Sequence, residues 1–221
     1  MGAAVLRQQF EPILGGPFNW RARQAPDRVR SGISELDCAT GGLPRGCLTE
    51  IFGPASSGRT SLLVSILAEA TARQEVCALV DAEDAFDPAS AAAGGVRLER
   101  LLWVRCAHNA EHALKAADLL IQGGGFGLVA MDLGDTPPQT ARRISLTSWF
   151  RLRRAVEHTP TVLVSVARQS NAKTCASLLL ECTRARTDWS GGGRLLLGIG
   201  VRIESRQRSM SCSPVFTATA I

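Results

Sequence analysis

A glycine-bounded loop constrains this chain more than any other feature. Residues 51–61 read Ile-Phe-Gly-Pro-Ala-Ser-Ser-Gly-Arg-Thr-Ser, which fits the phosphate-loop pattern G-x-x-x-x-G-K-[S/T] at Gly53, Gly58 and Thr60. Glycines at these positions let the backbone curl so that several N–H groups point at one phosphate. The pattern therefore predicts a strand, this loop and then a helix whose positive end faces a bound anion.

The loop predicts a site for ATP with Mg²⁺, in which Thr60 offers its hydroxyl to the cation. Arg59 stands where the pattern has lysine. A planar, fork-shaped guanidinium is not interchangeable with a compact ammonium, so we expect a nucleotide to bind and leave its hydrolysis open. The predicted nucleotide-binding residues are Gly53, Pro54, Ala55, Ser56, Ser57, Gly58, Arg59, Thr60 and Ser61.

Apolar runs and amphipathic segments alternate after the loop. Short apolar runs are typical of buried parallel strands, and the segments between them show the apolar spacing of helices. The alternation predicts an α/β fold with a P-loop NTPase core, a mostly parallel sheet flanked by helices. The expected strands are 47–52, 76–80, 101–104, 128–132 and 161–166, and the expected helices are 60–73, 89–93, 110–121 and 144–158. Residues 175–182 fit a strand or a helix, and 195–204 with 215–221 predict a C-terminal strand pair.

Length and charge bound the function classes. A chain of 221 residues can bury a full core, and we expect an N-terminal arm over 1–28 and one domain over 29–221. The formal net charge of +5 fits a nucleic-acid or acidic-protein partner. No apolar run is long enough to span a bilayer, and the start lacks the layout of a signal peptide, so we expect a cytoplasmic protein without a membrane partner.

Two acidic residues follow predicted strands. Asp132 closes the apolar run 128–131, where a carboxylate of P-loop enzymes holds Mg²⁺ directly or through water. Glu83 follows the run 76–80, where a carboxylate could orient a water for attack on the terminal phosphate. Because ligands of parallel α/β sheets bind at the carboxyl ends of strands, we predict Thr60 and Asp132 as metal contacts and Glu83 as the catalytic carboxylate.

These motifs resemble those of the bacterial recombinase RecA. The resemblance is carried by residues 43–60, from Leu-Pro-Arg-Gly to the phosphate loop, and by residues 81–88, Asp-Ala-Glu-Asp-Ala-Phe-Asp-Pro. It implies a RecA-type ATPase core over roughly residues 30–205. It also implies that Glu83 stands at the family's catalytic glutamate and Asp132 at its Walker-B aspartate.

The chain departs from the RecA pattern in a consistent way. Arg59 replaces lysine, and segments 132–144 and 167–177 are short where RecA carries its two DNA-binding loops. This shortened pattern resembles the ImuA group of RecA-like accessory proteins. The resemblance implies a role in SOS-induced translesion synthesis in the bacterial cytoplasm, with nucleoid association on DNA damage. Its implied partners are an ImuB-like polymerase-related protein and an error-prone DNA polymerase, with RecA and single-stranded DNA as further candidates.

Arginines gather around the predicted helix 144–158. Their guanidinium groups could contact the phosphates of single-stranded DNA, which would make binding depend strongly on salt. A solvated helix face explains the same pattern. The candidate DNA-binding residues are Arg142, Arg143, Arg151, Arg153 and Arg154.

Three functions stay open at this point. The first is a non-recombinase accessory protein of DNA repair that binds nucleotide and bridges polymerase partners. The second is an active DNA-dependent ATPase of the recombinase class, favoured by intact Glu83, Asp132 and Thr60. The third is an interaction module without nucleotide, similar to the cell-division inhibitor SulA. We expect the first, because backbone amides and a helix end supply much of the phosphate affinity, whereas turnover needs donors placed for transition-state charge.

Overall fold

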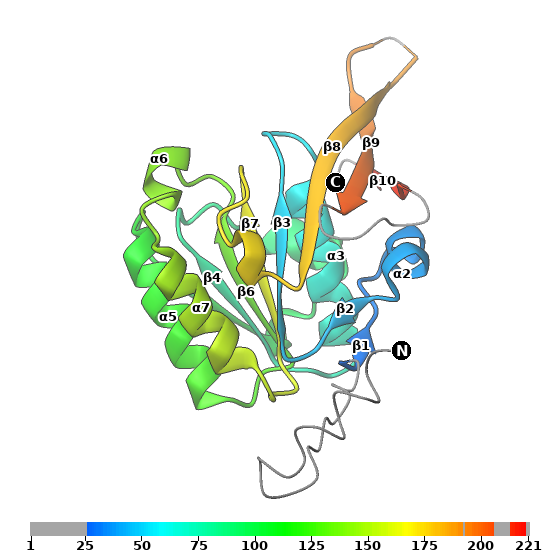
Figure 1. Cartoon of the computed structure of the whole chain (residues 1–221). Coiled ribbons are helices and arrows are strands. Elements are labelled where there is room, and N and C mark those ends of the chain that lie inside the picture. Colours follow the sequence, from blue (N-terminus) through cyan, green and yellow to red (C-terminus); the bar gives the residue numbers. More distant parts are fainter. Residues whose placement is uncertain (1–25, 192, 206–212, 220–221) are drawn as a thin grey trace, which may run out of the picture.

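The polypeptide forms three layers, a central sheet with helices on each of its two faces. The computed structural model describes residues 26–191, 193–205 and 213–219. Helices cover both faces of the sheet, as Figure 1 shows. Most of the predicted arm over 1–28 and most of the segment between the last two predicted strands lie outside the described residues. The division into an arm and a domain therefore stays a prediction.

The main sheet is mostly parallel. Its strands are β3 (Cys47–Phe52), β4 (Cys77–Asp81), β5 (Leu101–Arg105), β6 (Leu128–Leu133), β7 (Val162–Ala167), β8 (Leu178–Trp189), β9 (Leu196–Ser205) and β10 (Val215–Thr219). Among the described residues they pair in the order β10-β9-β8-β3-β7-β6-β4-β5. All neighbours from β8 to β5 are parallel, whereas β9 is antiparallel to β8 and β10 to β9. The predicted sheet and its C-terminal strand pair are confirmed.

Two groups of helices sandwich this sheet. The helices are α2 (Ser34–Thr40), α3 (Arg59–Ala72), α4 (Pro88–Ala93), α5 (Ala110–Gly123), α6 (Pro138–Ala141) and α7 (Leu146–Val156), with 3₁₀ turns η1 (Leu98–Arg100) and η2 (Lys173–Cys175). α2, α3 and α4 pack on one face, and α5 and α7 on the other. A small antiparallel pair, β1 (Arg28–Val29) and β2 (Leu43–Pro44), precedes β3. No described helix has the length and apolar character needed to cross a membrane.

Burial on both faces explains why the central strands are apolar runs. Every residue of β4 and of β7 is buried, as expected for parallel strands covered by helices on each side. Successive side chains point to opposite faces, so Leu79 joins the core under α3 and Val80 joins the core under α5 and α7. The fully buried Trp149 anchors α7 in the second of these cores.

Two elements differ from the sequence expectation. The ambiguous segment 175–182 holds the end of η2 and the start of β8, which continues to Trp189. Residues 184–187 are exposed, so no alternation of buried side chains marks this half of the strand. It forms a hairpin with β9 that projects past the helices (Figure 1). The predicted helix 144–158 is α7, and the short α6 before it was not expected.

Candidate nucleotide-binding site

The phosphate loop joins β3 to α3 at the carboxyl edge of the sheet. β3 ends at Phe52, and Gly58 precedes α3 in a left-handed conformation with a φ of 87°. The Gly58 carbonyl accepts a helical hydrogen bond from the N–H of Leu62 at 3.0 Å. The first N–H groups of a helix have no partner inside the helix. A strand, loop and helix in this order therefore present donors and a positive helix end to an anion.

The exposure of the side chains changes along the loop. Residues 54–56 are exposed, whereas residues 57–59 are buried. Thr60 is exposed again and Ser61 is half-buried. The hydroxyl of Ser57 is buried and has no hydrogen-bond partner among the residues that the structure describes. A ligand would therefore approach the loop from the side of residues 54–56 and Thr60.

Strands β8 and β9 pack directly against the two loop glycines. A Cβ atom at Gly53 would lie 2.2 Å from the carbonyl oxygen of Cys182. A Cβ atom at Gly58 would lie 2.2 Å from Cγ2 of Val201. Both distances are far below van der Waals contact. Space, as well as backbone conformation, therefore requires glycine at these two positions.

The Arg59 side chain turns toward the end of β6. Its Nη1 donates to the carbonyl oxygen of Gly134 at 3.1 Å, and the residue is only 7% exposed. Burial lowers the pKa of Arg59 from its ordinary value, while the nearby carboxylates of Asp132 and Asp135 act in the opposite direction. Within the described residues this is the one hydrogen bond of the Arg59 side chain, so its guanidinium keeps further N–H donors for a ligand.

Asp132 lies in β6 at the same edge of the sheet. Its Oδ1 accepts a hydrogen bond from the N–H of Gly134 at 2.7 Å, and its Oδ2 has no hydrogen-bond partner in the described part of the chain. Burial raises the pKa of Asp132 to about 6. One fixed and one available oxygen fit contact with a cation, or with its water, that arrives with a nucleotide. The described residues contain no cluster of three or more His, Cys, Asp or Glu that could hold a metal by itself.

Glu83 lies just past the end of β4, beside the strand that carries Asp132. β4 and β6 pair with Asp81 opposite Asp132. Asp81 accepts hydrogen bonds from the N–H of Glu83 at 3.3 Å and of Phe86 at 2.9 Å. The Oε2 of Glu83 lies 3.0 Å from Nδ1 of His108. Asp81 thus fixes the backbone beside Glu83, while the contact with His108, which the residue pattern does not predict, engages the carboxylate itself.

Arg168 is a further residue at this edge of the sheet, outside the predicted nucleotide-binding set. It follows β7, the strand between β3 and β6. Its Nε donates to the Gly134 carbonyl oxygen at 3.1 Å, and its Nη2 lies 3.4 Å from Oδ1 of Asp135. Its positive charge contributes to the lowered pKa of Arg59.

Glu50 fixes the turn that carries Arg168. It is a carboxylate of β3 with 0% exposure. Its Oε1 accepts hydrogen bonds from the N–H groups of Asn171 at 2.7 Å and Ala172 at 2.9 Å. Its Oε2 accepts one from the hydroxyl of Ser170 at 2.7 Å. The turn after β7 is therefore tied to the strand that enters the phosphate loop.

The five arginines predicted as DNA contacts fall into two groups. Two follow α6 and three lie on α7: Arg142 and Arg143, then Arg151, Arg153 and Arg154. Arg142 contacts a glutamine side chain just after β7. Arg151 pairs with a carboxylate of α5 at 3.4 Å, and Arg153 with one at the end of its own helix at 3.4 Å. Arg143 and Arg154 are exposed and have no ion pair among the described residues. DNA binding by this set stays a prediction.

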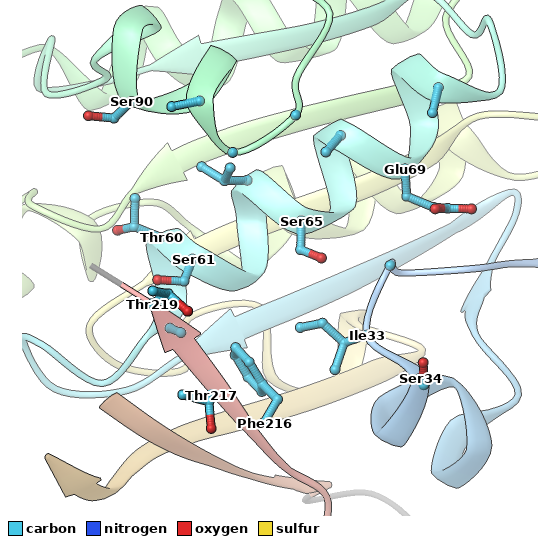
Figure 2. A pocket seen from close by; sticks show the side chains of 18 of the residues that line it. Ile33, Ser34, Thr60, Ser61, Ser65, Glu69, Ser90, Phe216, Thr217 and Thr219 are labelled. Atoms are coloured by element: carbon cyan, nitrogen blue, oxygen red, sulfur yellow. The ribbon is translucent and has the colours of Figure 1, made fainter. Parts of the chain in front are cut away.

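A groove of about 980 Å³ runs along the outer face of α3. Figure 2 shows Thr60, Ser61 and Thr219 near one end and Glu69 farther along the helix. β10 forms one wall, and the segment around Ser90 forms part of the other. The groove thus begins at the first turn of α3, where the phosphate loop ends. Hydroxyl and carboxylate groups line it together with apolar side chains.

Replacing Asp132 with asparagine is expected to stabilise the fold at pH 7.5 by about 2 kcal/mol and to change little near pH 4. The pKa of Asp132 is raised to about 6, above the value of an unfolded chain. The folded state therefore holds more protons than the unfolded state between these two values, and the wild type loses stability as pH rises through that window. Chemical denaturation of both proteins at the two pH values measures the difference.

The matched control is Asp135→Asn, because the Asp135 side chain is 62% exposed. It should change the free energy of unfolding little at either pH. If the difference in free energy of unfolding between Asp132→Asn and wild type is the same at both pH values, that result would contradict a raised pKa of Asp132 in the folded state.

Comparison with known proteins identifies a family that this chain resembles. Residues 20–137 match the family described as the RecA N-terminal domain, a range that contains the loop, Glu83 and Asp132. The chain is 34% identical over 161 residues to Protein RecA of Chloroflexus aurantiacus, covering 66% of this chain and 46% of that protein. For Protein RecA of Rickettsia massiliae the identity is 42% over 135 residues, covering 58% and 39%. The chain spans less than half the length of these curated relatives.

Proposed function

The chain belongs to the RecA family, and on that basis we propose that it is a RecA-like accessory protein of DNA repair. In this proposal it binds a nucleotide through its degenerate phosphate loop and does not act as a recombinase. One observation carries the proposal. The loop after β3, Asp132 in β6 and Glu83 after β4 lie along the same carboxyl edge of the parallel sheet, while Arg59, in the lysine position, is bound to a backbone carbonyl.

The proposed ligand is ATP. Its phosphates would lie against the amides of residues 53–60, and its base and sugar would lie in the groove that begins at Thr60 and Ser61. Mg²⁺ bound with the nucleotide supplies positive charge beside the phosphates. The Thr60 hydroxyl and the available oxygen of Asp132 are the protein contacts that fit such a cation.

Two short connections support a role without strand exchange. Only residues 134–137 separate β6 from α6, and only residues 168–172 separate β7 from η2. Glu50 ties the second connection down through three hydrogen bonds. A connection held in this way has little freedom to wrap around a DNA strand.

Hydrolysis is not part of the favoured function. Arg59 is held by the Gly134 carbonyl, and the Glu83 carboxylate is engaged by His108. An active DNA-dependent ATPase is the alternative, favoured by the placement of Glu83 and Asp132 on paired strands. A SulA-like module without nucleotide is the second alternative, favoured by the burial of Arg59.

The proposed setting is SOS-induced translesion synthesis, as the likeness to the ImuA group implies. There the protein would bridge an ImuB-like polymerase-related protein and an error-prone DNA polymerase in the bacterial cytoplasm. RecA and single-stranded DNA are further proposed partners. Binding measured between the purified chain and a purified ImuB-like protein tests the bridging role. No interaction at micromolar concentrations, with or without ATP, would count against it.

Replacing Arg59 with alanine is expected to weaken ATP binding by about tenfold to hundredfold, because a charge-assisted contact with phosphate is lost. Arg59→Lys should keep most of the affinity, since an ammonium retains the charge. Isothermal titration calorimetry with ATP and Mg²⁺ measures both. Lys115→Ala, which removes a positive charge from the exposed face of α5, is the matched control and should bind as wild type does.

The same titration separates the three functions. A wild-type chain that binds no ATP would leave only the SulA-like alternative. Steady ATP turnover stimulated by single-stranded DNA, and lost in Glu83→Ala, would favour the recombinase-class ATPase. Strand exchange catalysed by the purified chain would refute the accessory role.

A further inference from the structure

The contact between Glu83 and His108 joins two loops at one end of the sheet. Glu83 lies in the loop between β4 and α4, and His108 lies in the loop between β5 and α5. Oε2 of Glu83 is 3.0 Å from Nδ1 of His108. An ionised carboxylate only accepts hydrogen bonds, so Nδ1 carries the proton and donates it. The contact therefore occupies one of the two carboxylate oxygens of Glu83.

This contact ties the Glu83 carboxylate to the side of β4 that is opposite the phosphate loop. In the strand order β3-β7-β6-β4-β5, the strand that enters the loop and the strand that carries Asp132 both lie on one side of β4. His108 follows β5, which lies on the other side. A general base must come within hydrogen-bond reach of the water whose proton it takes. A carboxylate held at His108 is drawn away from a water beside a nucleotide in the phosphate loop.

Further contacts hold the same two loops together. Oδ1 of Asp84 accepts a hydrogen bond from the N–H of Ala107 at 3.3 Å, and Oδ2 lies 3.1 Å from Nη2 of Arg105. Asp84, Ala107 and His108 have φ angles of 55°, 49° and 60°, in the left-handed region that residues other than glycine seldom adopt. Backbone strain of this kind persists where surrounding contacts hold it. The contacts between the two loops thus fix them in one arrangement.

The two side chains of the contact differ in exposure. The His108 side chain is 71% exposed, whereas that of Glu83 is 17% exposed. An exposed imidazole can turn into solvent and exchange its hydrogen bond for one with water, which leaves no buried polar group of its own unpaired. The contact is therefore strong enough to favour one orientation of Glu83 and weak enough to open.

We propose that His108 is an autoinhibitory residue that holds Glu83 away from the attacking water, so that a nucleoside triphosphate bound at the phosphate loop is not hydrolysed. This inference rests on the proposed nucleotide binding and adds a latent ATPase controlled by one contact. When His108 releases Glu83, a water oxygen bonds to the terminal phosphorus and Glu83 takes the proton that the water gives up. The bond from that phosphorus to the bridging oxygen breaks, and its electron pair leaves with that oxygen on ADP.

Steady-state turnover of ATP by the full chain, with Mg²⁺, tests the role of His108. His108→Gly removes the imidazole, and glycine adopts a φ of 60° without strain. This variant should raise kcat by about fivefold to thirtyfold over wild type, because one hydrogen bond no longer competes for Glu83. Its Kd for ATP, measured by titration calorimetry, should stay within about twofold of the wild-type value. Damage to the fold would instead lower turnover and affinity together.

Three further variants isolate the contact. In His108→Asn the amide nitrogen takes the place of Nδ1 and donates to Glu83, so kcat should stay within about twofold of wild type. His112→Ala removes an exposed histidine in the first turn of α5 and should match wild type. His108→Gly combined with Glu83→Gln should lose the gain in turnover, because an amide cannot take the proton of the water. Circular dichroism and thermal unfolding confirm that each variant is folded.

The outcomes distinguish this inference from the proposed function. A His108→Gly protein that binds ATP and turns it over no faster than wild type would overturn the autoinhibitory role and leave nucleotide binding intact. A gain in turnover that persists with Glu83→Gln, or that His112→Ala shows equally, would also overturn it. No ATP binding by the wild type would refute the proposed function and this inference with it.

Discussion

Replacing Gly58 with alanine is expected to lower the free energy of unfolding by about 3 to 5 kcal/mol and to abolish nucleotide binding. Two costs add. A non-glycine residue is strained at a φ of 87°. The new Cβ would also lie 2.2 Å from Cγ2 of Val201, which is fully buried in β9 and cannot move aside without disturbing the core. Urea denaturation followed by circular dichroism measures the loss.

A second glycine provides the control for this experiment. A Cβ atom at Gly123, in the last turn of α5, would meet nothing within 4 Å. Gly123→Ala should therefore be neutral or stabilising by up to about 1 kcal/mol. Adding Val201→Ala to Gly58→Ala should relieve the steric part of the cost and leave the backbone strain. A Gly58→Ala protein as stable as Gly123→Ala would contradict the packing of β9 on the loop.

Replacing Glu50 with alanine is expected to destabilise the protein by about 3 kcal/mol, because three donors lose their common acceptor in a buried place. These donors are the N–H groups of Asn171 and Ala172 and the hydroxyl of Ser170. Thermal and urea unfolding measure the change.

Glu50→Gln is the conservative control. Its amide oxygen can accept both backbone N–H bonds, and its NH₂ can donate to the Ser170 hydroxyl once that hydroxyl turns. The expected cost is about 1 kcal/mol or less. Equal destabilisation by glutamine and alanine would show that charge, and not the hydrogen-bond pattern, holds the turn.

The fold follows from patterns that lie within short stretches of the chain. Runs such as 76–80 and 161–166 predict buried parallel strands, and the structure has β4 and β7 there with every residue buried. The phosphate-loop motif predicts the strand, loop and helix now seen as β3, residues 53–58 and α3. These predictions succeed because burial on both faces, helical periodicity and glycine conformations can each be recognised from a short stretch of the sequence.

Local patterns fail where the structure depends on contacts between distant segments. The exposed half of β8 shows no alternation and was not expected as a strand. The contact of His108 with Glu83 requires β5 to lie beside β4. The hydrogen bonds of Glu50 join residues about 120 positions apart and depend on the pairing of β3 with β7.

From its sequence alone, this protein is determined to be an α/β chain with a phosphate loop, an arginine at its basic position, and acids at 83 and 132 after buried strands. The tertiary structure alone decides that Arg59 and Arg168 share the Gly134 carbonyl and that Val201 closes on Gly58. The reason is physical. Motifs fix what a segment of backbone can do, but the order and register of strands in the sheet decide which side chains meet at its edge.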